Sequence, residues 1–276
     1  MKKISRRSFM AAAAVSVAAL AMTACGGSAS SAASSVASSA ASSEAVSSAA
    51  ELTTVEAGKL TMATNAAFPP YEMTTDAGEF EGIDVDTAKA IAEKLGLELQ
   101  IDDMDFDAAL LSVQQGKADI VMAGVTVTDE RKAVMDFSDS YATGIQSIIV
   151  PEGSDIASPD DLAGKKIGTQ RGTTGYIYCS DDFGDENVVA YDDGLTAVQA
   201  LNNGQVDAVV IDNAPAQEFV AANPGLKVLD TSYAEEDYAI GMAKGSALED
   251  AVNKALEELK ADGTLQAIVD KYINAN

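Results

Sequence analysis

The sequence contains no histidine and only two cysteines among its 276 residues. Histidine and cysteine are the usual ligands of transition metals in proteins, so no metal cluster of recognisable spacing can be found. The sequence also lacks both common glycine-rich patterns that bind phosphate groups. We therefore expect no catalytic residue, no metal site and no cofactor.

Basic residues are scarce as well. There are 18 Lys and Arg against 43 Asp and Glu, and the formal net charge is -25. A surface this acidic repels nucleic acids and anionic lipid headgroups, so we exclude nucleic acid as a partner. The charge favours solubility and says little about a small ligand.

Residues 1–24 are predicted to be a signal peptide. The segment has a basic start (Lys2, Lys3, Arg6 and Arg7), an apolar run from Phe9 to Met22, and small residues up to Ala24. The apolar run is too short to span a bilayer comfortably. Residues 5–9 also resemble a twin-arginine export signal, and the choice between that route and the general secretory route stays open.

The junction Ala24-Cys25-Gly26 resembles a lipobox, in which Cys25 becomes the lipidated first residue, although Met22 stands where leucine is usual. The alternative is a plain signal cleaved near Ala24. Residues 25–54 are almost entirely Ser and Ala up to residue 50, a composition typical of a disordered tether. We predict an exported protein, either anchored by lipid to the outer face of the cell membrane or periplasmic and membrane-anchored.

The second cysteine, Cys179, has no partner for an intrachain disulfide if Cys25 carries lipid. Because the chain has no histidine to activate a thiol, we interpret Cys179 as a small structural residue rather than a reactive one.

From residue 55 onward the chain alternates strand-like and helix-like segments. Strands are predicted at 59–64, 97–101, 119–123, 148–151, 165–169 and 206–211, and helices at 84–95, 107–115 and 193–203, with a short one opening at 158. Asp84 is expected to cap the first helix. This order is typical of an α/β fold in which mostly parallel sheets are flanked by helices on both faces.

Two short repeats suggest that the fold has two similar halves. Gly116-Lys117-Ala118-Asp119 is echoed by Gly204-Gln205-Val206-Asp207, each leading into an apolar strand. In open α/β sheets, ligands bind beyond the carboxyl ends of the strands. The segments expected at the site therefore begin at residues 65, 124, 170 and 212.

The segment 126–131, Thr-Val-Thr-Asp-Glu-Arg, contains the most informative candidate. Thr128 is a good helix N-cap, and Arg131 then falls in the first turn, where its guanidinium could grip a carboxylate through two hydrogen bonds. The alternative is a surface arginine paired with Asp136 or Glu130.

Taken together, the motifs resemble the bacterial extracellular solute-binding proteins of family 3, which bind polar amino acids for ABC importers. The resemblance rests on eight segments in the family's order: 63–72, 82–86, 104–107, 126–131, 136–141, 164–168, 172–174 and 262–264. It implies a two-lobed periplasmic-binding-protein-like fold of type II, hinged by two crossovers. Lobe 1 would comprise residues 55–149 and 236–276, and lobe 2 residues 150–235.

The resemblance also implies a monomer that holds one amino acid between the lobes and passes it to an ABC transporter permease. Arg131 would bind the ligand α-carboxylate, assisted by Thr126 and by the amides around Thr173 and Thr174. Asp212 and the carbonyl of Gly124 would take the α-ammonium. Phe68 and Phe106 would sandwich the side chain, near Asn65.

Several of these residues also have a simpler interpretation. Asp212, Thr173 and Thr174 could be helix caps, and Phe68 and Phe106 could be core residues. Receptors for cationic amino acids often have an acid where this chain has Asn65, and Gly175 leaves space where some relatives have a polar side chain. Both features favour a neutral polar ligand, unless Glu72 or Asp107 supplies an acid. Arg171 is expected to face solvent rather than to select an acidic side chain.

Two other functions remain open. The same fold hosts a periplasmic dehydratase, which here would need a carboxyl of raised pKa, such as Asp212 or Glu72. A sensory module that presents its ligand to a receptor is the third possibility. Turnover of a bound compound would indicate the dehydratase, and capture of a receptor partner would indicate the sensory module.

Overall fold

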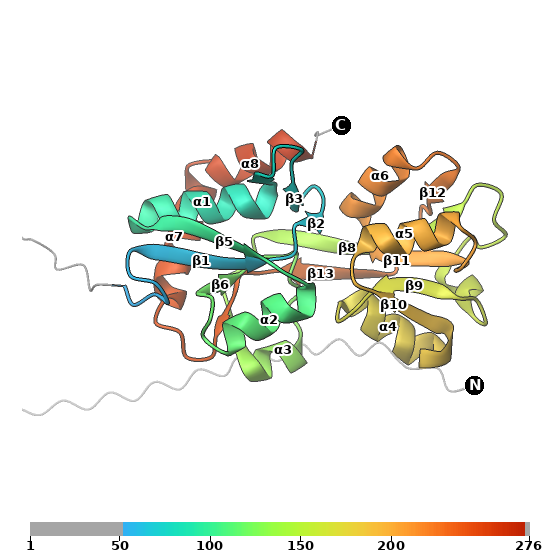
Figure 1. Ribbon diagram of the computed structural model, residues 1–276, viewed down its shortest axis with the longest axis horizontal. Helices are drawn as coiled ribbons and strands as arrows, with labels where there is room; N and C mark the ends of the chain where they lie inside the picture. Colours follow the sequence, from blue (N-terminus) through green and yellow to red (C-terminus); the bar gives the residue numbers. More distant parts are fainter. Residues whose placement is uncertain (1–51, 274–276) are drawn as a thin grey trace, which may run out of the picture. The chain divides into compact units, whose positions relative to one another are not determined.

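The computed structural model describes residues 52–273 (Figure 1). The predicted signal peptide, Cys25 and most of the predicted tether lie outside the described residues. Within the described range, no helix is both long and apolar enough to cross a membrane.

The first sheet has five strands in the order β5-β1-β6-β14-β7. β1, β5 and β6 are parallel, whereas β14 runs antiparallel to both β6 and β7. In Figure 1, α1 covers one face of this sheet and α2 the other, and the C-terminal helices α7 and α8 pack against α1. The strands are β1 (Lys59–Thr64), β5 (Glu98–Asp103), β6 (Ile120–Val121), β7 (Met135–Phe137) and β14 (Gly241–Ala243). The helices are α1 (Ile83–Leu95), α2 (Phe106–Gln114), α3 (Asp129–Val134), α7 (Glu249–Ala261) and α8 (Thr264–Tyr272).

The second sheet has the order β10-β9-β11-β8-β12, with β13 also paired to β8. β9, β10 and β11 are parallel, and β8 is antiparallel to each of its partners. Figure 1 shows α5 and α6 on one face and α4 on the other. The strands are β8 (Ala142–Pro151), β9 (Ile167–Gln170), β10 (Val188–Tyr191), β11 (Ala208–Asp212), β12 (Leu226–Val228) and β13 (Ala234–Tyr238). The helices are α4 (Thr174–Phe183), α5 (Gly194–Asn202) and α6 (Asn213–Ala222), with 3-10 turns at Pro159–Leu162 and Asp185–Asn187.

A small three-stranded sheet follows β1 and contains β2 (Ala67–Phe68), β3 (Glu72–Thr74) and β4 (Phe80–Glu81). We call the first sheet, this small sheet and helices α1–α3, α7 and α8 the first lobe. The second sheet with helices α4–α6 is the second lobe. The α/β, two-lobed fold class predicted from the sequence is confirmed, and in each sheet a parallel core of three strands is extended by antiparallel strands.

The antiparallel strands arise because the chain passes between the lobes twice. It leaves the first sheet after β7 and enters β8, and it returns from β13 to β14. β8 and β13 pair along residues 142–146 and 234–238. The lobe limits expected from the sequence, 149/150 and 235/236, therefore fall inside these two continuous strands of the second sheet.

Asp84 does not cap α1, contrary to the sequence-based prediction. The N-cap is Gly82, whose φ of 134° is open to glycine and where a Cβ would collide with the carbonyl of Tyr71. Asp84 instead lies fully buried within the first turn, and its Oδ2 accepts a hydrogen bond from the amide of Gly124 at 3.0 Å. The carboxylate therefore supports the loop after β6 rather than the helix.

The repeated Gly-x-x-Asp motif has the same structural role in both lobes. Gly116 and Gly204 both have positive φ, 65° and 66°, after a helix. Asp119 then accepts a hydrogen bond from the amide of Thr61 on the neighbouring strand, and Asp207 from that of Lys166, each at 2.8 Å. The repeated motif therefore has one structural role in both lobes: its aspartate accepts a backbone hydrogen bond near the start of the adjacent parallel strand.

The largest apolar cluster joins the two lobes. It contains Leu60 of β1 and Ile91 of α1 from the first lobe, and Val198 of α5 and Val209 of β11 from the second. Tyr238 lies fully buried within the same cluster, at the end of the crossover strand β13. Smaller clusters fill the faces covered by α2 and α4. Because this buried cluster extends through both lobes, the loops at the strand ends are supported by packed core residues.

Candidate functional site

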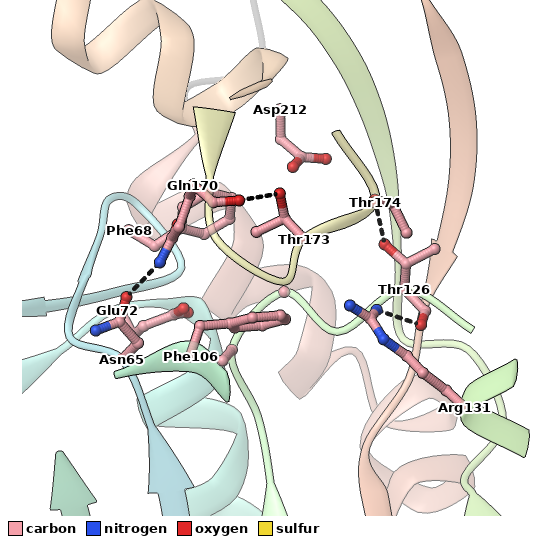
Figure 2. A pocket seen from close by; sticks show the side chains of 12 residues that line it. Asn65, Phe68, Glu72, Phe106, Thr126, Arg131, Gln170, Thr173, Thr174 and Asp212 are labelled. Carbon is pink, nitrogen blue, oxygen red and sulfur yellow. Dashed lines mark hydrogen bonds between the residues drawn. The ribbon is translucent and has the colours of Figure 1, made fainter. Parts of the chain in front are cut away.

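One pocket lies where the loops beyond the carboxyl ends of the strands meet. All nine side chains or backbones expected there from the sequence line it: Asn65, Phe68, Phe106, Gly124, Thr126, Arg131, Thr173, Thr174 and Asp212. Three more residues that the sequence did not assign, Glu72, Ala123 and Gln170, complete the lining. Figure 2 shows the amides of Asn65 and Gln170 at one end and Arg131 with Thr126 and Thr174 at the other.

Arg131 lies in the first turn of α3, which begins after Thr128. The Thr128 hydroxyl accepts a hydrogen bond from the Arg131 amide at 3.1 Å, the expected N-cap contact. The guanidinium donates to the carbonyls of Thr126 at 2.8 Å and Gly172 at 3.1 Å, and so reaches both lobes. It also lies 5.4 Å above the ring of Phe106.

The surface interpretation of Arg131 is wrong, because the residue is only 9% exposed and Asp136 pairs with Lys244. Burial lowers the pKa of Arg131, an effect opposed by the nearby charge of Glu236. No carboxylate of the described residues lies within ion-pair distance of this guanidinium. A buried cation without an ion pair is well suited to receive an anionic group.

Asp212 is the last residue of β11 and occupies the N-cap position of α6. Its side chain makes no capping hydrogen bond, so a simple capping role does not explain it. Oδ2 accepts from the side-chain amide of Gln146 at 2.9 Å. Burial raises the pKa of Asp212 to about 7, partly opposed by the nearby hydroxyl of Tyr238 and by the hydrogen bond from Gln146. A cationic group placed beside it would favour the carboxylate form.

The two threonines at the start of α4 have different roles. Thr173 is the N-cap, accepts from the amide of Tyr176 at 3.3 Å, and donates its own hydroxyl proton to the carbonyl of Gln170 at 2.8 Å. Thr174 is the first helical residue, and its hydroxyl lies 3.5 Å from that of Thr126 across the lobes. The free amides of this first turn form a favourable site for an anion, next to Arg131.

The two phenylalanines serve both as core residues and as pocket walls. Phe68 belongs to the cluster that joins the lobes, Phe106 to the cluster under α2, and both are nearly buried. Gly124 lies against the Phe68 ring with a φ of 53°, and a Cβ there would come within 2.9 Å of that ring. A glycine is therefore required where the backbone approaches the pocket.

The amide end of the pocket contains a contact between the lobes. Asn65 donates to the carbonyl of Met104 at 3.0 Å, which turns its Oδ1 toward the second lobe. Gln170 donates to that oxygen at 2.8 Å. The sequence indicated this loop but gave no reason to choose Gln170, because the pairing depends on how the lobes meet.

Glu72, which the sequence offered only as an alternative source of an acid, lines the pocket. It is fully buried, and neither carboxyl oxygen has a hydrogen-bond partner among the described residues. Burial, reinforced by the charge of Asp84, raises the pKa of Glu72 well above its ordinary value. Burial thus favours the neutral carboxyl form of Glu72, which can both donate and accept a hydrogen bond.

Three other expectations are settled by geometry. The space expected beside Gly175 is occupied, since a Cβ there would lie 2.9 Å from Oε1 of Gln146, and that interpretation was wrong. Arg171 faces solvent and lies 3.5 Å from Asp192. Cys179 is fully buried, and burial raises the pKa of its thiol to about 12. The described part of the chain contains no group of three or more candidate metal ligands.

Comparison with known proteins gives a consistent result. The family model described as "Bacterial extracellular solute-binding proteins, family 3" matches residues 60–275. The L-cystine-binding protein TcyJ of Escherichia coli (strain K12) is 34% identical over 226 residues, covering 80% of this chain and 85% of that protein.

Solved structures agree. The arginine-, lysine-, histidine-binding protein ArtJ of Geobacillus stearothermophilus is 35% identical, with a TM-score of 0.76 over 79% of this chain and 96% of that chain. An ancestral arginine-binding protein solved with glutamine bound is 43% identical, with a TM-score of 0.75 over 78% of this chain and 98% of that chain.

Proposed function

The chain belongs to the bacterial extracellular solute-binding proteins of family 3, and from this membership we propose that it captures one polar amino acid between its lobes for an ABC importer. The permease of that importer would be its protein partner, and the protein would act as a monomer. Hinge motion at the two crossovers, between lobes of about 55–149 with 236–276 and 150–235, would open and close the pocket.

The observation that supports this proposal is that one pocket contains both a buried cation, Arg131, and a buried acid, Asp212. A zwitterion enclosed between the lobes needs a cation at one end and an anion at the other, because an unpaired buried charge costs several kcal/mol. The pocket offers both, and both are less than a tenth exposed. A sugar or a simple organic acid would leave one of these charges without a partner.

The ligand α-carboxylate would lie against Arg131, the Thr126 hydroxyl and the first-turn amides of α4. The α-ammonium would lie against Asp212 and the carbonyl of Gly124. The rings of Phe68 and Phe106 would enclose the aliphatic part of the side chain. These roles satisfy both charges of the amino acid with groups that already line the pocket.

The end of the ligand side chain would lie near Asn65, Gln170 and Glu72. Because burial favours the protonated form of Glu72, its carboxyl can exchange two hydrogen bonds with a neutral amide, and we propose a neutral polar ligand such as glutamine. Arginine is the second candidate, since the unpartnered oxygens of Glu72 could accept from a guanidinium once ionised. Proteins similar to this chain include an arginine-binding one solved with glutamine.

A thermal-unfolding screen of the chain against the proteinogenic amino acids and cystine tests the proposal. A ligand present at 100 times its dissociation constant adds about 2.7 kcal/mol of stability. We expect one amino acid, or a small set with N–H donors at the end of the side chain, to raise the midpoint. A rise with sugars or peptides alone, or chemical conversion of a bound compound, would contradict the proposal.

Glu72→Gln distinguishes the two candidate ligands. Gln at this position is neutral at every pH, so it can still bond an amide but cannot pair with a cation. We expect glutamine affinity to change by less than about fivefold and arginine affinity, if present, to fall about a hundredfold, as for loss of one partner of a buried charge pair. Calorimetric titration of both amino acids measures this, with Glu79→Gln on the exposed loop as the control. Equal losses for both ligands would exclude a charge-dependent role for Glu72.

We further propose that residues 1–24 direct export, by the twin-arginine or the general secretory route, and that Cys25 carries the lipid. Residues 25–54 would then tether the lobes to the outer face of the membrane. Labelling of cells with a fatty-acid analogue should tag the wild-type protein and not Cys25→Ser. Label on both proteins would place the anchor elsewhere.

A further inference from the structure

A buried glutamate on the crossover strand is not among the residues that line the pocket. Glu236 lies in β13, is 7% exposed, and accepts four hydrogen bonds. Its Oε1 accepts from the hydroxyl of Tyr178 at 2.7 Å. Its Oε2 accepts from the remaining three donors: Thr174 Oγ1 at 2.9 Å, Gln146 Nε2 at 3.0 Å and Thr126 Oγ1 at 3.2 Å.

These donors come from both lobes. Thr126 follows β6 of the first lobe, whereas Thr174 and Tyr178 lie one helical turn apart on the same face of α4 in the second lobe. Figure 2 shows the hydroxyls of Thr126 and Thr174 meeting beside Arg131. Glu236 therefore accepts hydrogen bonds from Thr126 in the first lobe and from Thr174 in the second. These two residues flank the position proposed for the ligand carboxylate.

Gln146 extends this network to the other end of the ligand. Its side-chain nitrogen donates one hydrogen bond to Glu236 and one to Oδ2 of Asp212, at 3.0 and 2.9 Å. The amide has two protons, so both bonds form together. Glu236, Gln146 and Asp212 thus connect the carboxylate end and the ammonium end of the pocket.

The charge of Glu236 is balanced by hydrogen bonds rather than by an ion pair. No Lys or Arg of the described residues lies within ion-pair distance of it. A buried carboxylate of this kind depends on its donors, and each hydrogen bond to a charged group contributes more than a neutral one. Removing the carboxylate would free Thr126, Thr174 and Tyr178 at once.

We propose that Glu236 is a positioning residue that latches Thr126 of the first lobe to the N-terminal turn of α4 and thereby favours the closed arrangement of the lobes. All of its bonds are made to protein groups, so the latch acts before the ligand arrives.

Release of one donor to the ligand follows from the crowding at Oε2. A carboxylate oxygen has about two lone-pair sites, and this one is approached by three donors. Thr126, the most distant, can turn its proton to an arriving carboxylate while Gln146 and Thr174 keep the oxygen satisfied. The hydrogen bond from Thr126 to Glu236 would then be exchanged for one from Thr126 to the ligand carboxylate, with little loss of free energy. This last step rests on the proposed function, whereas the latch itself does not.

Hydrogen exchange followed by mass spectrometry on the chain without added amino acid tests the latch. The comparison is Glu236→Ala against Glu235→Ala, a substitution of the exposed glutamate next to it on β13. We expect exchange at 124–128 and 173–178 to be about tenfold or more faster in Glu236→Ala, with α1 unchanged. Glu236→Gln keeps one oxygen acceptor and should return exchange to within about threefold of wild type.

A second readout uses L-glutamine and L-arginine as probes. Dissociation of whichever amino acid binds should be about tenfold faster in Glu236→Ala, with association within about twofold, because closure chiefly slows release. If Glu236→Ala fails to fold, Tyr178→Phe is the substitute, because it removes only the 2.7 Å hydrogen bond from the Tyr178 hydroxyl to Glu236. Hydrogen exchange should then be faster at residues 173–178 alone.

Exchange equal to that of Glu235→Ala, or faster throughout the molecule including α1, would overturn the latch. If the two segments loosen as expected but neither probe binds the wild type, the latch stands and the proposed ligand class fails.

Discussion

Arg131→Ala is expected to abolish amino-acid binding, with affinity at least a hundredfold weaker than wild type. The guanidinium is nearly buried and is held in place by the carbonyls of Thr126 and Gly172. Removing one partner of a buried, hydrogen-bonded charge pair costs about 2–5 kcal/mol, because the other charge is left enclosed without compensation. Calorimetric titration of the amino acid found by the screen measures the loss.

Arg131→Lys is the matched control for this substitution. Lysine keeps the charge but cannot bond two carbonyls and a carboxylate with one planar group. We expect it to recover part of the lost affinity and to remain at least about tenfold weaker than wild type. Binding by Arg131→Ala within about threefold of wild type, with the circular dichroism spectrum retained, would exclude Arg131 from the site.

Asp212→Asn is expected to weaken binding about a hundredfold or more while stabilising the protein free of amino acid near neutral pH. Burial raises the pKa of Asp212 to about 7 in the folded chain, against an ordinary value of 3.8. Well below pH 3.8 the carboxyl is protonated in both folded and unfolded chains and has no effect on stability. As the pH rises from 3.8 to about 7, the unfolded chain ionises first and stability is lost, and above 7 the loss stays constant.

The amide removes this cost, so the free energy of unfolding should rise at pH 8 by up to about 4 kcal/mol relative to wild type and change little at pH 4. Urea unfolding at the two pH values measures the difference. Asp76→Asn, on the exposed loop between β3 and β4, is the control and should show no such gain. An Asp212→Asn variant that is less stable than wild type at pH 8 would show that the carboxylate is not under strain.

The parts of the site that could be predicted from the sequence follow from local rules. Strands ended where alternating apolar runs ended, and α/β topology brings those ends together, so Asn65, Gly124 and Asp212 were expected at one edge. Thr128 could be recognised as a cap because capping depends on four consecutive residues. The resemblance to a known family favoured a carboxylate-binding role for Arg131 over the alternative of a surface ion pair.

The parts that could not be predicted depend on contacts between distant segments. Asp84 looked like a cap until the fold placed it against the amide of Gly124, 40 residues away. Gly175 appeared to leave space, which Gln146 of another strand fills. Glu236 stands between two exposed acids, Glu235 and Asp237, and only the alternation of the β13 strand turns it inward.

Calorimetric titration with glutamine and arginine, each compared with its decarboxylated amine and its deaminated acid, tests the central claim most directly. If Arg131 and Asp212 hold the two charges of a zwitterion, one parent amino acid should bind with a stoichiometry of one. Both of its truncated forms should then be at least a hundredfold weaker, because each leaves one buried charge unpaired. Equal binding of the parent, the amine and the acid would contradict the claim that this pocket recognises an amino acid by its α-carboxylate and α-ammonium.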